Sequence, residues 1–218
     1  MEDAEGGLTQ VEEITRALVA RTPLIDGRVA PPTAREVHPP SMAVVAHSPA
    51  RPLRSTTVAE MLLMRVRGLF SAAPLAGPAT RALVAAPRSP SHAWIAFLGP
   101  KATVTVAGCG SDCRDIEAVA VDSTAPSSPG SPLHLLGPAA VRVLARAGPE
   151  RNWTELGSFQ YDPNGLPCQG TSLRDRTGVL RREGVEIQVQ MEPREGAHSV
   201  ALSGIRFLAG VSPGPKHS

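Results

Sequence analysis

The sequence predicts an all-β fold, a β-sandwich or jelly roll with a short N-terminal helix. Twenty-two prolines and twenty glycines among 218 residues disfavour long helices, because proline breaks a helix and glycine weakens it. Several short stretches alternate apolar and polar residues with the period of two that buries one face of a strand. About eight such strands, separated by turn-forming residues, are typical of a sandwich.

The N-terminal part is expected to be a helix followed by a linker. Apolar residues recur at helical spacing from Leu8 to Arg21, and Thr9 with Glu12 has the pattern of a capping box. Residues Asp26 to Pro40 lack periodicity and contain two proline pairs, which is typical of an extended connector. The expected domains are therefore residues 1–40, a helix and Pro-rich linker, residues 41–211, a β-sandwich domain, and residues 212–218, a tail.

Apolar or alternating stretches place five strands in the first half of the domain, at residues 42–46, 81–85, 94–97, 102–106 and 116–121. The third and fourth of these flank the turn-like sequence Leu98-Gly99-Pro100-Lys101, so we expect them to pair as a hairpin. The stretch from Thr56 to Phe70 fits both a helix and a buried strand, and its length favours the helix.

The second half begins with a loop from Ser123 to Gly137 whose apolar tip is Leu133, Leu135 and Leu136. A loop of this length in a compact domain is usually functional or disordered. Alternation then predicts strands at residues 140–146, 185–191 and 200–208.

The clearest local signal is the stretch from Trp153 to Gln169. Leu156, Phe159 and Tyr161 alternate with polar residues as in a strand with one buried face. Asp162-Pro163-Asn164-Gly165 follows, and Asn-Gly tolerates positive φ, so we expect a turn here and pairing with the residues that come after it.

This stretch also resembles a known family. Leu-Gly-Ser-Phe-x-Tyr-Asp-x-x-Gly followed by Pro167 and Gln169 is similar to a segment late in SUN domains, the β-sandwich modules that bind KASH peptides inside the nuclear envelope. The resemblance extends to four further segments, in the same order and with the same spacing: residues 93–106, 127–144, 185–189 and 205–207. It implies a SUN-like, galactose-binding-like jelly roll over roughly residues 42–210.

The resemblance also implies a function for several residues. It makes the loop from Ser123 to Leu136 a lid whose leucines Leu133, Leu135 and Leu136 cover an extended peptide held by β-augmentation. In the segment that corresponds to the family's peptide-carboxylate pocket, His198 and Ser199 are the candidate donors. The implied partner is a KASH-like peptide of a membrane protein, the implied location is the nuclear envelope or endomembrane lumen, and the module is open to forming a homo-oligomer.

The chain also departs from the family. Ala93 and Ala201 occupy the positions of the usual cysteine pair, so we expect no disulfide and a free thiol at Cys168. Pro87 replaces the aspartate of the family's cation loop and offers a cation only a carbonyl. We therefore expect neither a metal nor a cofactor.

Other function classes are disfavoured or stay open. A net charge of +2 with dispersed arginines gives no case for nucleic acid, and no enzyme signature is present. The chain has no apolar run long enough to span a membrane. Asn152-Trp153-Thr154 is an N-glycosylation sequon, which matters only in a lumenal compartment. The alternative to the SUN-like interpretation is a jelly-roll module for carbohydrate or another small ligand, which the strand-like context of the two tryptophans disfavours.

Overall fold

The computed structural model describes residues 22–38, 42–53, 94–99, 101–123 and 137–211. Several sequence-based expectations lie outside these residues and stay predictions: the N-terminal helix, the stretch at residues 56–70, the strand at residues 81–85, Ala93, the cation-loop position Pro87, and the apolar tip Leu133, Leu135 and Leu136. In the residues that the structure describes, no helix is long and apolar enough to cross a membrane.

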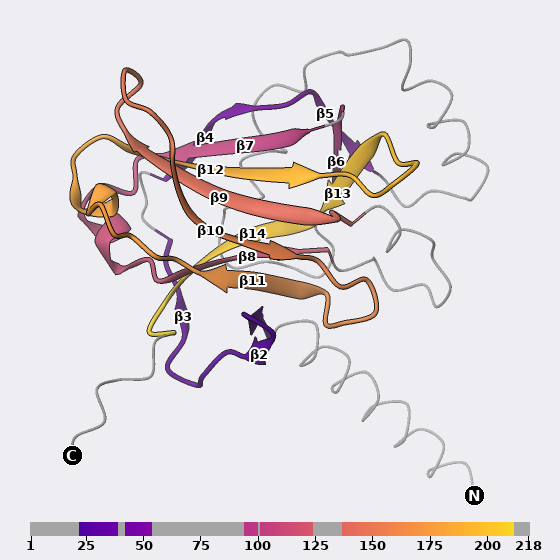
Figure 1. Cartoon of the computed structure of the whole chain (residues 1–218), viewed down its shortest axis with the longest axis horizontal. Coiled ribbons are helices and arrows are strands. Elements are labelled where there is room, and N and C mark those ends of the chain that lie inside the picture. Colours follow the sequence, from indigo (N-terminus) through magenta and orange to yellow (C-terminus); the bar gives the residue numbers. More distant parts are fainter. Residues whose placement is uncertain (1–21, 39–41, 54–93, 100, 124–136, 212–218) are drawn as a thin grey trace, which may run out of the picture.

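The chain folds into an all-β sandwich, as the alternating stretches predicted (Figure 1). One sheet of six strands has the order β2 (Arg28–Val29), β1 (Leu24–Ile25), β11 (Cys168–Ser172), β8 (Ala118–Asp122), β14 (Gly204–Ala209) and β3 (Arg35–Glu36). A five-stranded sheet faces it, with the order β10 (Thr154–Gln160), β9 (Ala140–Ala147), β12 (Val185–Glu192), β7 (Ala102–Ala107) and β4 (Ala43–His47). A small sheet of β13 (Ser199–Leu202), β6 (Trp94–Leu98) and β5 (Ala50–Leu53) completes the fold.

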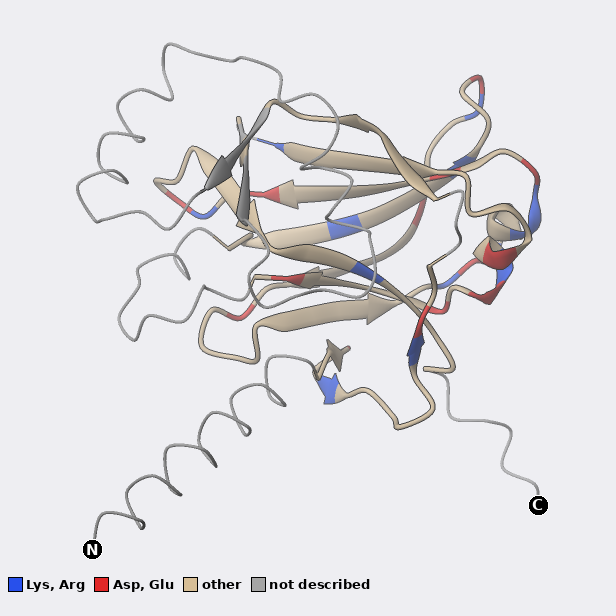
Figure 2. Cartoon of the chain, turned by 180° about the vertical axis from the view of Figure 1, so that it is seen from behind, with Lys and Arg blue, Asp and Glu red and all other residues tan. Residues whose placement is uncertain are grey.

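The main core lies between the six- and five-stranded sheets. Strand β12 buries every second residue, and these side chains pack against buried residues of β8 and β14 such as Val121 and Phe207. Apolar burial of this kind stabilises a fold by roughly 1.5–3 kcal/mol per large side chain. Residues Gly110–Asp115 and Val179–Arg181 form two 3-10 helices, η1 and η3, at one end of the sandwich. Figure 2 shows charged residues of both signs interspersed at that end.

A connector was expected from Asp26 to Pro40, but the described part of it, residues 26–38, belongs to the sandwich. Strand β1 pairs with β11, and β3 pairs with β14. Ile25 packs into a second, smaller core with Ala120 and Leu208 on the outer face of the six-stranded sheet. Composition did not reveal these contacts, because they depend on residues far away in the chain.

Two expected strand pairings are wrong. Strands β6 and β7 flank the expected turn, but β6 pairs with β5 and β13 whereas β7 pairs with β4 and β12. Strand β10 pairs with the preceding β9, and after the turn β11 pairs with β8 and β1. Both connections carry the chain from one sheet to another. The strand expected at residues 200–208 is likewise divided at Ser203 into β13 and β14, which belong to different sheets.

The expectation that the fold contains no disulfide is also wrong. Cys109 and Cys113 are joined at η1, with their Cα atoms 5.2 Å apart, because the tight turn brings residues four positions apart within bridging distance. Cys168 is a buried thiol outside this bridge, as expected.

Candidate functional site

The connection between β10 and β11 forms one wall of the candidate site, at the end of the sandwich opposite η1 and η3. Its sequence is the one that resembles the SUN segment, and the structure shows the contacts of Leu156, Gly157 and Tyr161 in it. Leu156 lies in the core, and a Cβ atom at Gly157 would lie 2.9 Å from the backbone oxygen of Ser172, so glycine lets β10 approach β11. The phenol of Tyr161 donates to the carbonyl of Pro167 over 2.9 Å.

Gln169 holds the turn that follows β10. Its amide nitrogen donates to the carbonyls of Asp162 and Leu166 over 2.6 and 2.7 Å, and its amide oxygen accepts from the N–H of Asp162 over 2.9 Å. Gly165 lies near this amide with ordinary φ, so the positive φ expected at Asn-Gly is absent from the turn. The turn therefore depends on a side chain seven residues away from Asp162 rather than on a left-handed glycine.

The ends of the segment 124–136 are both fixed at this wall. Ser123 donates its N–H to the carbonyl of Pro167 over 3.0 Å, and the same carbonyl accepts from the phenol of Tyr161 over 2.9 Å. Burial raises the pKa of Tyr161 to about 12, so the phenol stays protonated and available as a donor. At the other end, Ala139 donates its N–H to the carbonyl of Glu192 over 2.7 Å. We call Ser123, Gly137, Tyr161, Pro167 and Arg194 the loop-root cluster.

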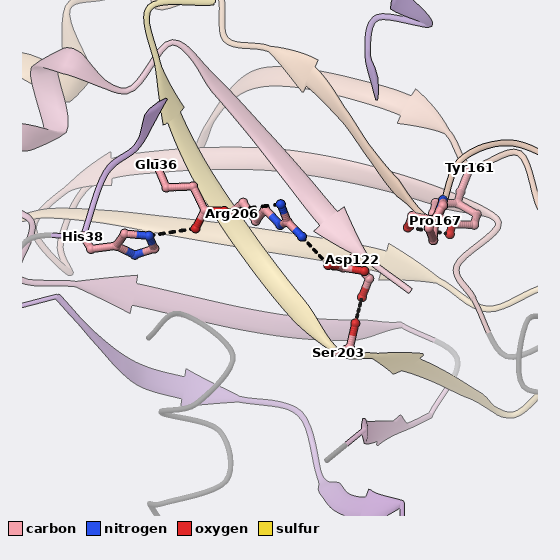
Figure 3. A network of polar contacts seen from close by, with 7 residues as sticks. All are labelled: Glu36, His38, Asp122, Tyr161, Pro167, Ser203 and Arg206. Carbon is pink, nitrogen blue, oxygen red and sulfur yellow. Dashed lines mark hydrogen bonds and ion pairs between the residues drawn. The ribbon is translucent and has the colours of Figure 1, made fainter. Parts of the chain in front are cut away.

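A buried ion pair fixes the first of these ends (Figure 3). Arg206, on β14, donates to the carboxylate of Asp122, the last residue of β8, over 2.7 Å, and its other terminal nitrogen lies 3.3 Å from Glu36. His38 in turn contacts Glu36 over 2.7 Å, and the Ser203 hydroxyl donates to the carbonyl of Asp122 over 3.0 Å. These contacts place Ser123 rigidly beside Tyr161.

Arg194 carries the one buried donor of the loop-root cluster that lacks an acceptor. Its Nε donates weakly to the carbonyl of Gly137 over 3.4 Å, while its Nη2 is buried and has no hydrogen-bond partner. Among the ion pairs of the described residues, none involves Arg194. A buried guanidinium nitrogen without a hydrogen-bond partner costs free energy, so Nη2 of Arg194 marks a place where a ligand could supply an acceptor.

A hollow of about 380 Å³ lies beside the residues that precede Arg194 in the chain. It is lined by Gly99, Lys101, Glu192, Pro193, Ala197 and His198. Lys101 and His198 are exposed, and they supply donors, whereas the exposed carboxylate of Glu192 supplies an acceptor. None of the described residues that line this hollow is Phe, Tyr or Trp.

The structure therefore brings together some of the expected site residues. His198 lines the hollow, and Ser199 follows it as the first residue of β13, where it pairs with Leu98. Lys101 and Arg194 were missed by sequence reasoning. Arg194 stands within the segment that the SUN resemblance assigns to carboxylate binding, so its charge was an available signal, but its burial was not. The described residues contain no cluster of ligands that could hold a metal ion.

Comparison with known proteins identifies no family. No protein-family model matches the chain, and no curated protein matches it. Among solved structures, a family 32 carbohydrate-binding module of NanJ from Clostridium perfringens, solved with galactose, covers 80% of the chain and 98% of its own length at 9% identity and a TM-score of 0.44.

Two other solved structures are similarly distant. The third family 32 module of a Clostridium perfringens family 31 glycoside hydrolase has 7% identity and a TM-score of 0.48, with 81% of this chain and 95% of its own covered. The N-terminal domain of the strand-break repair protein XRCC1 has 13% identity and a TM-score of 0.37, with 77% and 98% covered. At these values the likenesses carry no argument about the function of this chain.

Proposed function

We propose that this chain is a non-catalytic binding module that holds an extended peptide by its free C-terminal carboxylate. The observation that carries the proposal is the buried Nη2 of Arg194, which has no acceptor at the ends of the segment 124–136. The peptide class is the one that the SUN resemblance implies, a KASH-like C-terminus of a membrane protein in the nuclear envelope or endomembrane lumen.

The charge of Arg194 favours an anionic ligand from outside the chain. The segment 124–136 contains neither Asp nor Glu, so it has no carboxylate of its own to offer. A peptide carboxylate beside Arg194 would supply a charge-assisted hydrogen bond, the stronger kind, to a donor that is already desolvated. Because this donor is buried before binding, the ligand does not bear the cost of burying it.

His198 and Lys101 supply further hydrogen-bond donors at the hollow. Pro193 lines the hollow, and Arg194 follows it directly in the chain. A peptide whose terminal carboxylate binds Arg194 would therefore also meet the donors Lys101 and His198 of the hollow. Ser199 follows His198 in the chain and is the remaining candidate donor. These groups would orient the last residues of the peptide, because each presents a hydrogen-bond donor toward a backbone acceptor.

A second candidate ligand is a carbohydrate, which the mixed polarity of the hollow favours. Glu192 accepts hydrogen bonds while Lys101 and His198 donate them, and a sugar offers hydroxyls of both roles. The volume of about 380 Å³ lies in the range of small-ligand sites. Sugar sites generally add an aromatic ring for stacking, and the described lining residues offer no Phe, Tyr or Trp.

Binding of matched peptides tests the first candidate. The full chain should be titrated with synthetic C-terminal peptides of single-span nuclear-envelope proteins, each prepared with a free carboxylate and with a C-terminal amide. We expect the carboxylate form to bind at least about tenfold more tightly, since a charged hydrogen bond contributes about 1.5–3 kcal/mol. Arg194→Gln should abolish this preference, whereas Arg182→Gln, at an exposed arginine beside η3 at the opposite end of the sandwich, should retain it.

The thermal midpoint separates function from folding in this test. Since Nη2 of Arg194 has no partner, Arg194→Gln should leave the midpoint of the free protein unchanged or raise it. Equal binding of carboxylate and amide peptides by the unmodified chain would contradict the peptide proposal. Galactose that binds to the unmodified chain and not to a Lys101→Ala, Glu192→Gln variant would assign the hollow to the second candidate.

A further inference from the structure

The connection between β9 and β10 carries the one N-glycosylation sequon of the chain. The chain has two asparagines, and only Asn152 is followed two positions later by Ser or Thr, in Asn152-Trp153-Thr154. Asn152 is exposed, and Thr154 is the first residue of β10. An acceptor asparagine in a surface connection remains accessible after folding.

The contacts that the structure records at the β9–β10 connection are made by residues other than Asn152. Trp153 stacks on the guanidinium of Arg146 at 4.4 Å from the ring centroid, and Arg146 also pairs with Glu186 over 2.6 Å. Gly148 donates to the carbonyl of Gly184 over 3.1 Å. The fold at this point is therefore secured by residues before and after Asn152, so a large group on its side chain disturbs no contact that the structure records there.

One further observation agrees with a lumenal environment. Cys109 and Cys113 form a disulfide, a bond that forms and persists in oxidising compartments.

The connection between β9 and β10 lies at the end of the sandwich opposite the loop-root cluster (Figure 1). Strand β9 separates the two ends, since Ala140 pairs with Glu192 and Ala147 pairs with Val185. Its eight residues span roughly 25 Å at about 3.3 Å per residue.

We propose that Asn152 is the acceptor of an N-linked oligosaccharide when the chain is in the lumen, a location that it shares with the proposed function. The side-chain nitrogen of Asn152 attacks the anomeric carbon of an oligosaccharide that is linked through a diphosphate to a lipid. A carbon–nitrogen bond forms, the carbon–oxygen bond to the diphosphate breaks, and the amide gives up one proton. The lipid diphosphate leaves, and no oxidant or reductant is needed.

The test is expression of the full chain behind a cleavable signal sequence, with only protease-protected lumenal chain analysed. We expect one slower-migrating form that peptide N-glycosidase removes, leaving aspartate at position 152. The form should be lost in Asn152→Gln and in Thr154→Ala, and it should persist in Thr154→Ser, which keeps the sequon. Lumenal chain without any glycosidase-sensitive form would overturn the proposal.

A second sequon supplies the matched control. Leu166→Thr places a threonine two positions after Asn164, which is exposed at the opposite end of the sandwich, and so creates a sequon there. Two removable glycans in this variant support the proposal, and a single glycan at Asn164 overturns it. Peptide titration of the glycosylated chain distinguishes this proposal from the proposed function. A glycosylated chain that does not prefer the carboxylate peptide contradicts the proposed function alone. A chain that binds the peptide but is never glycosylated contradicts the glycosylation proposal alone.

Discussion

Gln169 shows how a single side chain can determine the course of a connection. It is buried, and its amide satisfies one N–H and two carbonyls of the turn between β10 and β11. The turn contains no residue with positive φ, and its own backbone bond, from the N–H of Gly165 to the carbonyl of Asp162, is long at 3.2 Å. The position of Tyr161, and through it that of Ser123, therefore depends on this amide.

Replacement of Gln169 by leucine should destabilise the fold by about 2–4 kcal/mol. The leucine keeps the volume but leaves the N–H of Asp162 and the carbonyl of Leu166 without partners, and a buried unsatisfied group costs about 1–3 kcal/mol. The midpoint of urea unfolding measures the effect. Gln160→Leu is the matched control, since Gln160 is exposed on β10, and its effect should stay within about 0.5 kcal/mol. Equal effects of the two substitutions would show that the three hydrogen bonds do not hold the turn.

At the scale of elements, Arg206 connects three strands of one sheet. It stands on β14, pairs with Asp122 on β8, and lies beside Glu36 on β3. Its burial alone would lower the pKa of the guanidinium, but the carboxylate of Asp122, together with Cys168 as a thiolate at the high pH where arginine titrates, raises it overall. The charged form is therefore the stable one, and the ion pair ties the end of β8 to the strand beside it.

Removal of this cation should be far more costly than removal of an exposed one. Arg206→Met leaves the buried carboxylate of Asp122 without its partner, a change that costs about 3–5 kcal/mol. Arg142 and Glu192 form an exposed pair at 3.9 Å, and Arg142→Met should cost less than about 1 kcal/mol. Chemical denaturation of both variants measures the difference. A double variant, Arg206→Met with Asp122→Leu, should recover part of the lost stability, and no recovery would contradict the role given to the buried charge.

At the scale of the whole molecule, the N-terminal segment 22–38 covers the outer face of the six-stranded sheet. Asp26 holds it there: its carboxylate accepts from the Thr171 hydroxyl over 2.9 Å and from the Ser172 N–H over 3.3 Å. Burial of Asp26 works to raise its pKa, but the hydrogen bonds from Ser172 and Thr171 outweigh it, and the pKa is lowered from 3.8. The folded state therefore favours the ionised carboxylate.

Asp26→Asn should lower stability at neutral pH and have less effect in acid. A depressed folded pKa contributes stability above the unfolded value of 3.8, and this contribution is lost as pH falls through the folded value. The difference in urea midpoint between the two proteins should therefore be largest near pH 7 and should shrink below about pH 3.8. Asparagine also tolerates the positive φ of 51° at this position, so the backbone is unchanged.

Limited proteolysis of the same variant is a second measurement. Because the segment 22–38 is held in the sheet, trypsin should cut it slowly at Arg28 and Arg35 in the unmodified chain and faster in Asp26→Asn. Rapid cleavage of the unmodified chain at these arginines would instead support the connector expected from the sequence.

The sequence by itself determined the class of fold and the position of most described strands. Alternation of apolar and polar residues is a local property, and strands β7, β9, β10 and β12 lie where it predicted them. The SUN-like stretch was also recognisable as a turn, because Asp162, Pro163 and Gly165 favour turns individually. His198, which the resemblance named as a donor, lines the hollow, and its role in binding stays a prediction.

The tertiary structure alone decided which strands pair and which charges are buried. The turns after β6 and β10 have the residues of hairpins, but they join different sheets, and local sequence does not distinguish a chain reversal within a sheet from a crossing between two. The anchors of the fold join residues far apart in the chain: Asp26 with Thr171 across 145 positions, and Arg206 with Asp122 across 84. Arg194 looked like any other arginine, because local sequence does not reveal that its Nη2 is buried without a hydrogen-bond partner.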